Sequence, residues 1–367
     1  MTILVTGASG LIGRHTVELL VRRGEAVRTF QRAAPDSAAE AEWMSRAKAE
    51  RDPRAAADRA TKANAQRKFS TDAERDSAAD ADRKSNDRAE GDSAAEKAAA
   101  ERALKPNVEH LRGDVRKDVE ALCQAAQGCR AVVHLAGRGD VGESRRDPLG
   151  YAQLNATGAL HALQAARAAN AVFVLASSQR VYPLQPQLCA ENDTLAPDSP
   201  YGYAKWVAEL WCRMATEQFG VTTRVLRFFS VYGPGQQANG GSGVVTIFLQ
   251  AALNAEPLTI QSAGKRDFTD VRDVARGIAL AVDQPADRRH RIYNVATGLG
   301  TSFSELARLI KELSGSTSPI EERLSEPPGR DLVADISRAR NELRYAPCIQ
   351  LREGLQQYIE WLRQNSA

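Results

Sequence analysis

The chain has 367 residues, which is enough for one large α/β domain with an appended lobe or for two core-forming units. It contains no run near the ~18 uninterrupted apolar residues of a membrane span, and a formal net charge of +3 is too small to indicate nucleic-acid binding. Its five cysteines show no CxxC pairing, which argues against both a disulfide framework and a zinc site.

The N-terminal residues MTILVTGASG enter an apolar strand at once, without a basic leader or a small-residue cleavage site. We therefore expect a cytoplasmic protein. Residues 2–34 follow the pattern of a strand, a glycine turn, a helix and a second strand.

The glycine turn VTGASGLIG places Gly7, Gly10 and Gly13 at a GxxGxxG spacing. It follows a predicted strand and opens a predicted helix, where backbone without side chains lets a pyrophosphate approach the helix N-terminus. We expect the turn and the adjoining residues, Leu11, Ile12 and Arg14, to bind a dinucleotide. A tight turn without a ligand is the alternative.

The second strand ends in TFQR, where a carboxylate would accept the adenine-ribose hydroxyls of NAD. Arg32 instead offers a planar fork suited to a 2′-phosphate, and Arg14 is a second candidate clamp. The sequence therefore favours NADP over NAD, although Arg32 also fits an exposed charge at a strand end.

Residues 36–103 differ in composition from the rest of the chain. They contain 22 alanines and 30 charged residues, with no Val, Ile or Leu, so they are unable to bury a core of their own. We expect a helical or partly disordered insertion after the second strand, acting as a lid or docking segment or as an inert insertion. Its 14 basic and 16 acidic residues nearly cancel, which argues against a nucleic-acid arm.

Beyond residue 103, the apolar runs NVEHL, AVVHLAG, AVFVLASS and TTRVLRFF alternate with helical patterns. This alternation predicts an α/β fold with a doubly wound parallel sheet. The helix expected from about Leu149 to Ala169 is interrupted by Gly158. After residue 229 the chain is richer in Gly and Pro and closes with the amphipathic segment LREGLQQYIEWLRQ, which indicates a smaller C-terminal lobe over the ligand-binding edge of the sheet.

The segment SPYGYAKWVAEL contains a candidate catalytic pair. Residues four apart on a helix share one face about 6 Å apart along the axis, so Tyr201 and Lys205 point the same way, whereas Tyr203 lies roughly 200° round. An ammonium group near a phenol favours the phenolate, so Tyr201 would exchange a proton as hydride moves. We expect Tyr203 to serve packing or substrate contact.

Further motifs surround this pair in order along the chain: TGASGLIG, GDV at 113–115, VVHLAG, YAQLNATGALHALQAA, FVLASSQRVYP and RFFSVYGPG. Together they resemble the extended short-chain dehydrogenase/reductase family, in its nucleotide-sugar epimerase and dehydratase group. The resemblance covers nearly the whole chain outside 36–103. It implies a Rossmann NAD(P)-binding domain at 1–35 and 104–229, and a mainly substrate-binding lobe at 230–367 with elements that return to the first domain.

The resemblance also implies individual roles. Tyr201 would be the acid/base, Lys205 its electrostatic partner and ribose anchor, Ser178 a second hydroxyl on the same substrate oxygen, and Asn155 the residue of a helix bulge that supports the lysine. Cofactor contacts are implied at Asp114 and Val115 for the adenine, and at Leu135, Ala136 and Gly137 beside the nicotinamide. Arg266 and Arg330 would hold the diphosphate of a nucleotide sugar.

Departures from the family narrow the reaction. Gln179 and Arg180 stand where 4,6-dehydratases have Asp and Glu, so dehydration is disfavoured. Ser230 and Pro183 replace an asparagine and a glycine found in many epimerases. The resemblance then implies 4-epimerisation of a nucleotide sugar, with an NADPH-dependent 4-ketoreductase as the alternative and a non-catalytic NAD(P)-binding scaffold or sensor as an alternative of another class. By resemblance we expect a homodimer.

Overall fold

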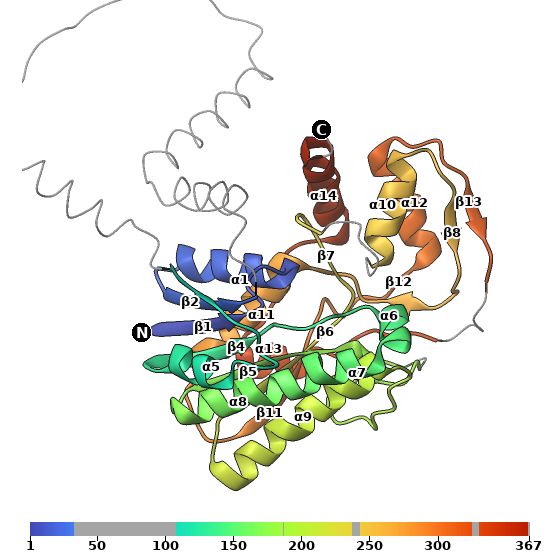
Figure 1. Cartoon of the computed structure of the whole chain (residues 1–367). Helices are drawn as coiled ribbons and strands as arrows, with labels where there is room; N and C mark the ends of the chain where they lie inside the picture. Colours follow the sequence, from blue (N-terminus) through green and yellow to red (C-terminus); the bar gives the residue numbers. More distant parts are fainter. Residues whose placement is uncertain (33–107, 186, 237–242, 325–329, 366–367) are drawn as a thin grey trace, which may run out of the picture.

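The computed structural model describes residues 1–32, 108–185, 187–236, 243–324 and 330–365. The predicted insertion at 36–103 lies outside these residues. Within them, a seven-stranded sheet is flanked by helices on both faces, and a smaller C-terminal lobe stands beside the carboxyl edge of the sheet (Figure 1). The predicted doubly wound α/β fold is confirmed.

The main sheet has the strand order β11-β6-β5-β4-β1-β2-β3, and all six neighbouring pairs run parallel. Its strands are β1 Thr2–Thr6, β2 Ala26–Gln31, β3 Val108–Arg112, β4 Cys129–His134, β5 Val172–Ser178, β6 Thr223–Phe228 and β11 His290–Val295. The strand order reverses between β1 and β4, which is where ligands bind in open sheets of this kind.

Alternation along β1 divides the core into two layers. Ile3 and Val5 face one hydrophobic cluster, with α1 Leu11–Arg22, α11 Val271–Asp283 and α13 Ser337–Leu343. Leu4 faces the other cluster, with α5 Val119–Ala126, α8 Gly158–Ala168 and α9 Pro200–Phe219. Because successive side chains of a strand point to opposite faces, the near-continuous apolar strands are buried on both sides.

The C-terminal lobe has its own core around Phe248, Leu306 and Tyr358. It comprises α10 Val244–Leu253, α12 Phe303–Ser314 and α14 Leu351–Asn365, with the short strands β7 Val231–Tyr232, β8 Leu258–Ile260, β9 Lys265–Arg266, β10 Thr269–Asp270, β12 Thr301–Ser302 and β13 Ile320–Glu322. From the same part of the chain, β11, α11 and α13 pack with the main sheet. The exact domain limits given above stay a prediction.

The helical stretch expected at about 149–169 is continuous but changes type. It begins as α7 Pro148–Tyr151, passes through a π-helical turn at Ala152–Thr157, and continues as α8. The short helix α6 Val141–Arg146 lies just upstream and is separated from α7 by Asp147. Gly158 does not interrupt the helix, since it lies just after the π turn and allows close contact with Val115, whose Cγ2 would lie 3.0 Å from a Cβ at this position. In the described residues no helix is long and apolar enough to cross a membrane. All five cysteines are free thiols.

Candidate functional site

The glycine turn stands at the carboxyl end of β1. Gly7 has a φ of +71°, and a Cβ there would lie 2.5 Å from the backbone nitrogen of Ala136, so the position requires glycine. A Cβ on Gly13 would collide with the Gly7 carbonyl. Gly10 caps α1 and is exposed, and among the described residues a Cβ there would meet Gly7 O alone, at 3.4 Å.

The space in front of the first turn of α1 is therefore open. The N–H groups of this turn, which includes Leu11 and Ile12, have no acceptor within the helix and carry its positive end. The side chain of Arg14 folds back onto the turn, with Nε donating to Ser9 O at 2.9 Å. This arrangement fits the pyrophosphate of a dinucleotide, as the sequence predicts.

The loop after β4 forms the opposite wall of this opening. Ala136 N donates to Thr6 Oγ1 at 3.4 Å and Leu135 N donates to Thr6 O at 3.2 Å, so the loop is bonded to the end of β1. A Cβ on Gly137 would lie 2.6 Å from Asn155 Oδ1 and 3.3 Å from Lys205 Nζ. Glycine is thus needed where the loop passes the lysine.

Asn155 lies in the π turn and is buried. Its Oδ1 accepts from Arg138 N and its Nδ2 donates to Arg138 O, both at 3.0 Å. The asparagine therefore fixes the backbone of the loop through two hydrogen bonds. The support of Lys205 by Asn155 stays a prediction; the same loop brings Gly137 next to both Asn155 and Lys205.

Tyr201 and Lys205 share the buried face of α9, beside Ser178 at the end of β5. Pro200 and the Ser199 cap, whose Oγ accepts from Gly202 N at 3.3 Å, start the helix just before Tyr201. Lys205 Nζ donates to Ala176 O at 2.8 Å. Tyr203, in contrast, is 52% exposed and lies against Trp206.

The surroundings of these groups set their protonation. Burial lowers the pKa of the Lys205 ammonium to about 8, while Glu209 acts in the opposite direction. Burial raises the pKa of the Tyr201 phenol, and a hydrogen bond with Ser178 and the charge of Arg180 both act to lower it. We call Gly137, Asn155, Ser178, Tyr201 and Lys205 the Tyr201 corner, which combines a phenol, a hydroxyl and an ammonium suited to moving a proton.

Arg180 is a charged residue beside the Tyr201 corner, and the sequence motifs assigned it no role in binding or catalysis. It follows Ser178 by two positions, and this short spacing is the feature of the sequence that could have indicated its place near the Tyr201 corner. The neighbouring Gln179 is buried and donates Nε2 to Ser230 Oγ at 3.0 Å. The two departures noted at 179 and 230 therefore contact each other across the ends of β5 and β6.

The end of β2 and the loop after β3 lie on the far side of the glycine turn. We call Gln31, Arg32, Asp114 and Arg116 the Arg32 edge. Arg32 is exposed. Asp114 is paired with Arg116, whose Nη2 lies 2.6 Å from Oδ2, and hydrogen bonds with Arg116 lower the pKa of Asp114 to about 2.

Val115, next to Asp114, is buried, and its carbonyl accepts from His161 Nδ1 at 2.8 Å. Its side chain packs against α8 at Gly158. The predicted adenine contact of Asp114 would thus compete with Arg116, whereas Val115 is held by the fold.

In the lobe, the two predicted diphosphate arginines are close together. Arg266 is buried and donates Nη1 to Arg330 O at 2.8 Å, and its guanidinium lies 5.2 Å from the Phe303 ring centroid. The adjacent Asp267 is fully buried and accepts from Thr297 N at 2.9 Å and Gly298 N at 2.8 Å. The segment that carries Arg266 is thereby fixed against the loop after β11.

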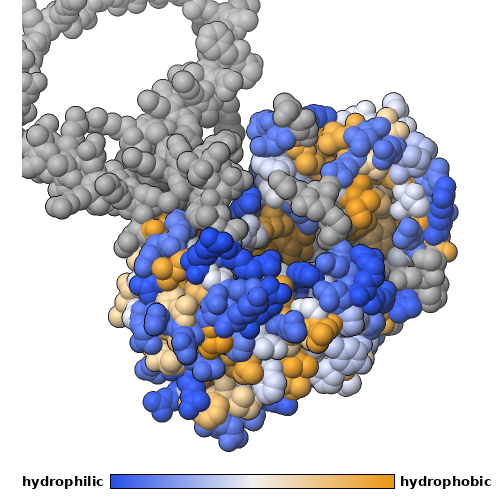
Figure 2. Space-filling model, viewed as in Figure 1, coloured by the Kyte–Doolittle hydropathy of each residue, from blue (hydrophilic) through white to orange (hydrophobic). Residues whose placement is uncertain are grey.

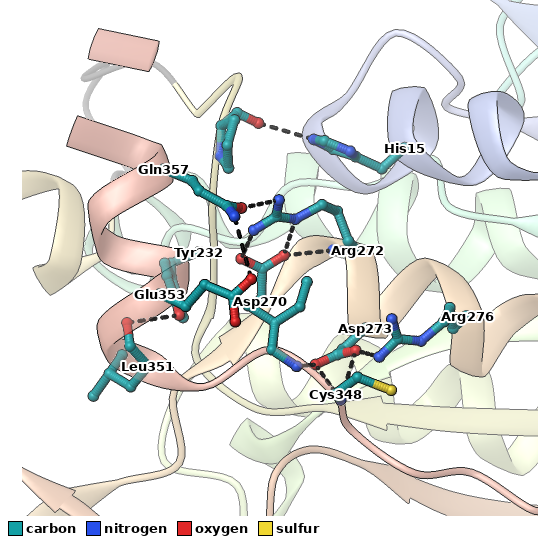
Figure 3. Close-up of polar contacts among 12 residues, drawn as sticks. His15, Tyr232, Asp270, Arg272, Asp273, Arg276, Cys348, Leu351, Glu353 and Gln357 are labelled. Carbon is teal, nitrogen blue, oxygen red and sulfur yellow. Dashed lines mark hydrogen bonds and ion pairs between the residues drawn. The ribbon is translucent and has the colours of Figure 1, made fainter. Parts of the chain in front are cut away.

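Contacts between the lobe and α1 join the two parts of the site. His15 Nε2 bonds the Pro234 carbonyl at 2.9 Å, and Arg272 on α11 links the cap residue Asp270 to Gln357 on α14 (Figure 3). Figure 2 shows a hollow between the sheet domain and the lobe, with apolar residues in its floor. The helix that begins at the glycine turn is tied directly to the lobe by the bond between His15 and Pro234.

The model of the NAD dependent epimerase/dehydratase family matches residues 3–296 of the chain. The chain is 32% identical over 243 residues to the UDP-glucose 4-epimerase of Mycolicibacterium smegmatis, covering 64% of this chain and 76% of the relative. It is 31% identical over 250 residues to an uncharacterised UDP-glucose epimerase of Bacillus subtilis, covering 66% and 77%.

Solved structures share the fold over the whole length. A UDP-glucose 4-epimerase of Thermotoga maritima, solved with UDP-glucose, superposes with a TM-score of 0.74 at 24% identity and 100% coverage of both chains. MoeE5 in complex with UDP-glucuronic acid and NAD superposes with a TM-score of 0.74 at 26% identity and 99% coverage of both chains.

Proposed function

The chain belongs to the NAD dependent epimerase/dehydratase family, and we propose that it is an epimerase acting at C4 of a nucleotide-linked sugar. The observation that carries the proposal is the Tyr201 corner. The phenol, the Ser178 hydroxyl and the Lys205 ammonium meet at the carboxyl end of β5, next to a loop and a glycine turn that fit a dinucleotide.

In the proposed reaction the 4-hydroxyl of the sugar is bound between Ser178 Oγ and the Tyr201 hydroxyl. Tyr201, in its phenolate form, accepts the proton of that hydroxyl and becomes the neutral phenol, and Ser178 orients the oxygen. The nicotinamide, when bound, supplies the acceptor and donor of the hydride. After the 4-keto sugar has rotated within the site, so that its opposite face receives the hydride, Tyr201 returns the proton to the oxygen.

Lys205 and Asn155 support this step. The ammonium, placed beside Gly137, would anchor the cofactor ribose. Burial raises the pKa of the Tyr201 phenol, and the groups that favour its phenolate are the Ser178 hydroxyl and the charge of Arg180. Asn155 holds the backbone of the loop after β4 through two hydrogen bonds, so that the spacing between this loop and Lys205 stays fixed. In the lobe, Arg266 and Arg330 would bind the diphosphate, for which paired guanidinium groups provide bidentate geometry.

A second candidate is reduction of a 4-keto sugar with NADPH, in which Tyr201 donates its proton once. The observation that favours it is the Arg32 edge, where the strand ends in Gln31 and Arg32 rather than in a carboxylate. The family is NAD-dependent by its description and MoeE5 was solved with NAD, so these comparisons favour epimerisation.

We further propose a homodimer formed through α9 and the helical stretch from α7 to α8 that contains Asn155. The side chains of Leu149, Tyr203 and Phe219 are large and apolar but exposed on α7 and α9. Large apolar side chains left exposed on helices are a common feature of interaction surfaces.

The proposal is tested by supplying UDP-glucose, UDP-galactose and their 4-keto analogue with NAD⁺, NADP⁺ or NADPH, and determining the stereochemistry of the product. Epimerisation without net consumption of cofactor supports the first candidate, and oxidation of NADPH supports the second. Tyr201→Phe should lower kcat by about 10²–10⁴-fold while cofactor binding persists, since it removes only the proton-transferring hydroxyl.

Tyr203→Phe is the matched control, because it removes an exposed hydroxyl two residues along the same helix. It should leave kcat unchanged. Cofactor binding without turnover of any sugar would instead favour a binding protein or sensor, and unaltered turnover in Tyr201→Phe would refute the role of the tyrosine.

A further inference from the structure

Arg180 is held between the Ser178 end of β5 and the start of α9. Its backbone N–H donates to Ser178 Oγ at 3.2 Å. Its carbonyl packs so closely on α9 that a Cβ at Gly202 would collide with it. The position of Arg180 relative to both proposed catalytic hydroxyls is therefore set by backbone contacts.

The guanidinium of Arg180 is only weakly neutralised. Its Nη1 lies 4.0 Å from Asp198 Oδ2, at the limit of an ion pair, and the Asp198 side chain is 41% exposed. A second arginine contacts the same residue, since Arg145 Nη2 donates to the backbone carbonyl of Asp198 at 3.5 Å. The charge of Arg180 acts to lower the pKa of the Tyr201 phenol, in agreement with the backbone contacts that hold Arg180 between Ser178 and α9.

Gln179 adds a neutral polar group beside this cation. The residue is 8% exposed, its Nε2 donates to Ser230 Oγ, and its Oε1 has no hydrogen-bond partner in the part of the chain that the structure describes. A buried carbonyl oxygen without a partner is costly unless a ligand satisfies it. The two residues that follow Ser178 thus offer a charged donor group and an unfilled acceptor.

We propose that Arg180 binds a carboxylate carried next to C4 of the sugar, so that the substrate is a nucleotide-linked sugar acid. The inference rests on the proposed function, in which O4 of the sugar lies between Ser178 and Tyr201. A substituent on C3 or C5 is then the part of the sugar nearest to Arg180. A guanidinium binds a carboxylate through two parallel hydrogen bonds, a geometry that a neutral hydroxymethyl group does not offer.

Two kinds of sugar place a carboxylate there. In a uronic acid the carboxylate is C6, attached to C5, whereas in N-acetylmuramic acid it belongs to the ether group on C3. The unfilled acceptor of Gln179 would bind a neighbouring hydroxyl or N–H in either case.

The test compares kcat/KM for UDP-glucuronate, UDP-N-acetylmuramate and UDP-glucose in the full chain with its cofactor. One of the two acidic sugars should be preferred over UDP-glucose by at least about 10-fold. Arg180→Gln should lower that preference about 10- to 100-fold, mainly by raising KM for the acidic sugar, and Arg180→Lys should retain part of it.

Two further variants separate binding from structural effects. Arg145→Gln removes a second arginine beside Asp198 and should leave the preference unchanged. Asp198→Asn releases Arg180 from its carboxylate neighbour and should increase the preference a few-fold, which gives a readout even where Arg180→Gln folds poorly.

Equal or better turnover of UDP-glucose by the wild-type protein, or an unchanged preference in Arg180→Gln, would overturn the sugar-acid inference and leave C4 chemistry intact. Failure to turn over all three sugars would overturn the proposed function as well. The preferred acidic sugar identifies which carbon carries the carboxylate.

Discussion

At the Tyr201 corner, Asn155, Ser178 and Lys205 are buried and hydrogen-bonded within the fold, whereas at the Arg32 edge the side chain of Arg32 is exposed and the charge of Asp114 is shared with Arg116. Both regions lie at the carboxyl ends of strands of one sheet. They differ in how many contacts fix each functional group.

The difference in burial between the two regions determines how strongly a substitution should affect each of them. Groups in the corner interact in a low-dielectric interior, where an interaction is strong and its loss is costly. Groups at the edge are screened by water and salt, so each contributes little. A substitution in or beneath the corner should therefore have a large effect on activity or stability, while each exposed side chain at the edge should change the preference between NAD and NADP only slightly.

The largest effect is expected at the buried ion pair beneath the corner. Arg227 is 1% exposed and bonds Glu209 through Nε at 3.0 Å and Nη2 at 2.6 Å, and Glu209 also accepts from Ser177. Arg227→Met leaves Glu209 buried without its cation. We expect a loss of about 3–5 kcal/mol in the free energy of unfolding, measured by urea denaturation.

Arg224→Met is a matched control on the same strand. Arg224 is equally buried but donates to the carbonyls of Ala281 and Pro285, at 2.9 and 2.6 Å. Its removal leaves no buried charge, and the cost should be smaller, about 1–3 kcal/mol. Equal destabilisation of the two variants would show that the ion pair between Arg227 and Glu209 adds nothing beyond the burial of an arginine.

A pH dependence should arise from Lys205. Because burial lowers its pKa to about 8, the folded protein loses this charge as the pH rises through 8. We expect kcat/KM to fall about tenfold per pH unit above that value, since the ribose anchor and the positive charge disappear together. A profile that stays flat from pH 7 to 10 would contradict a catalytic role for the charged lysine.

Stability provides an independent readout with the opposite sign. Between pH 8 and the ordinary lysine value of 10.5 the unfolded chain holds a proton that the folded chain has released, so this group makes stability rise with pH. Lys205→Met removes the contribution of this titration to stability. Subtracting the free energy of unfolding of the variant from that of the wild-type protein at each pH isolates the contribution.

Much of the corner was predictable from the sequence because its residues come in short local patterns. The four-residue spacing of Tyr201 and Lys205 determines a shared helix face, and the glycine turn follows from its place between a strand and a helix. The parallel sheet likewise follows from alternating apolar runs and helical segments.

Contacts between distant segments were not predictable in this way. The bond from Gln179 to Ser230 joins two strands, and the charge of Arg180 reaches Tyr201 from another element. The pairing of Asp114 with Arg116 depends on rotamers that a spacing argument does not determine. The π turn at Asn155 was likewise expected only through the family resemblance, because spacing alone does not tell a π turn from a continuous α-helix.

The smallest effect is expected at the Arg32 edge. If Arg32 contacts a 2′-phosphate, Arg32→Ala should weaken NADPH binding about two- to fivefold at 0.15 M salt and leave NADH binding unchanged, because the charge is exposed. Titration of each reduced cofactor at low and moderate ionic strength measures the difference. Arg116→Gln frees Asp114 from its partner without removing Arg32, and it should change the affinities for both cofactors alike. Equal affinity of the wild-type protein for NADPH and NADH would remove the reason to favour reduction, and the edge would then contribute charge without selecting a cofactor.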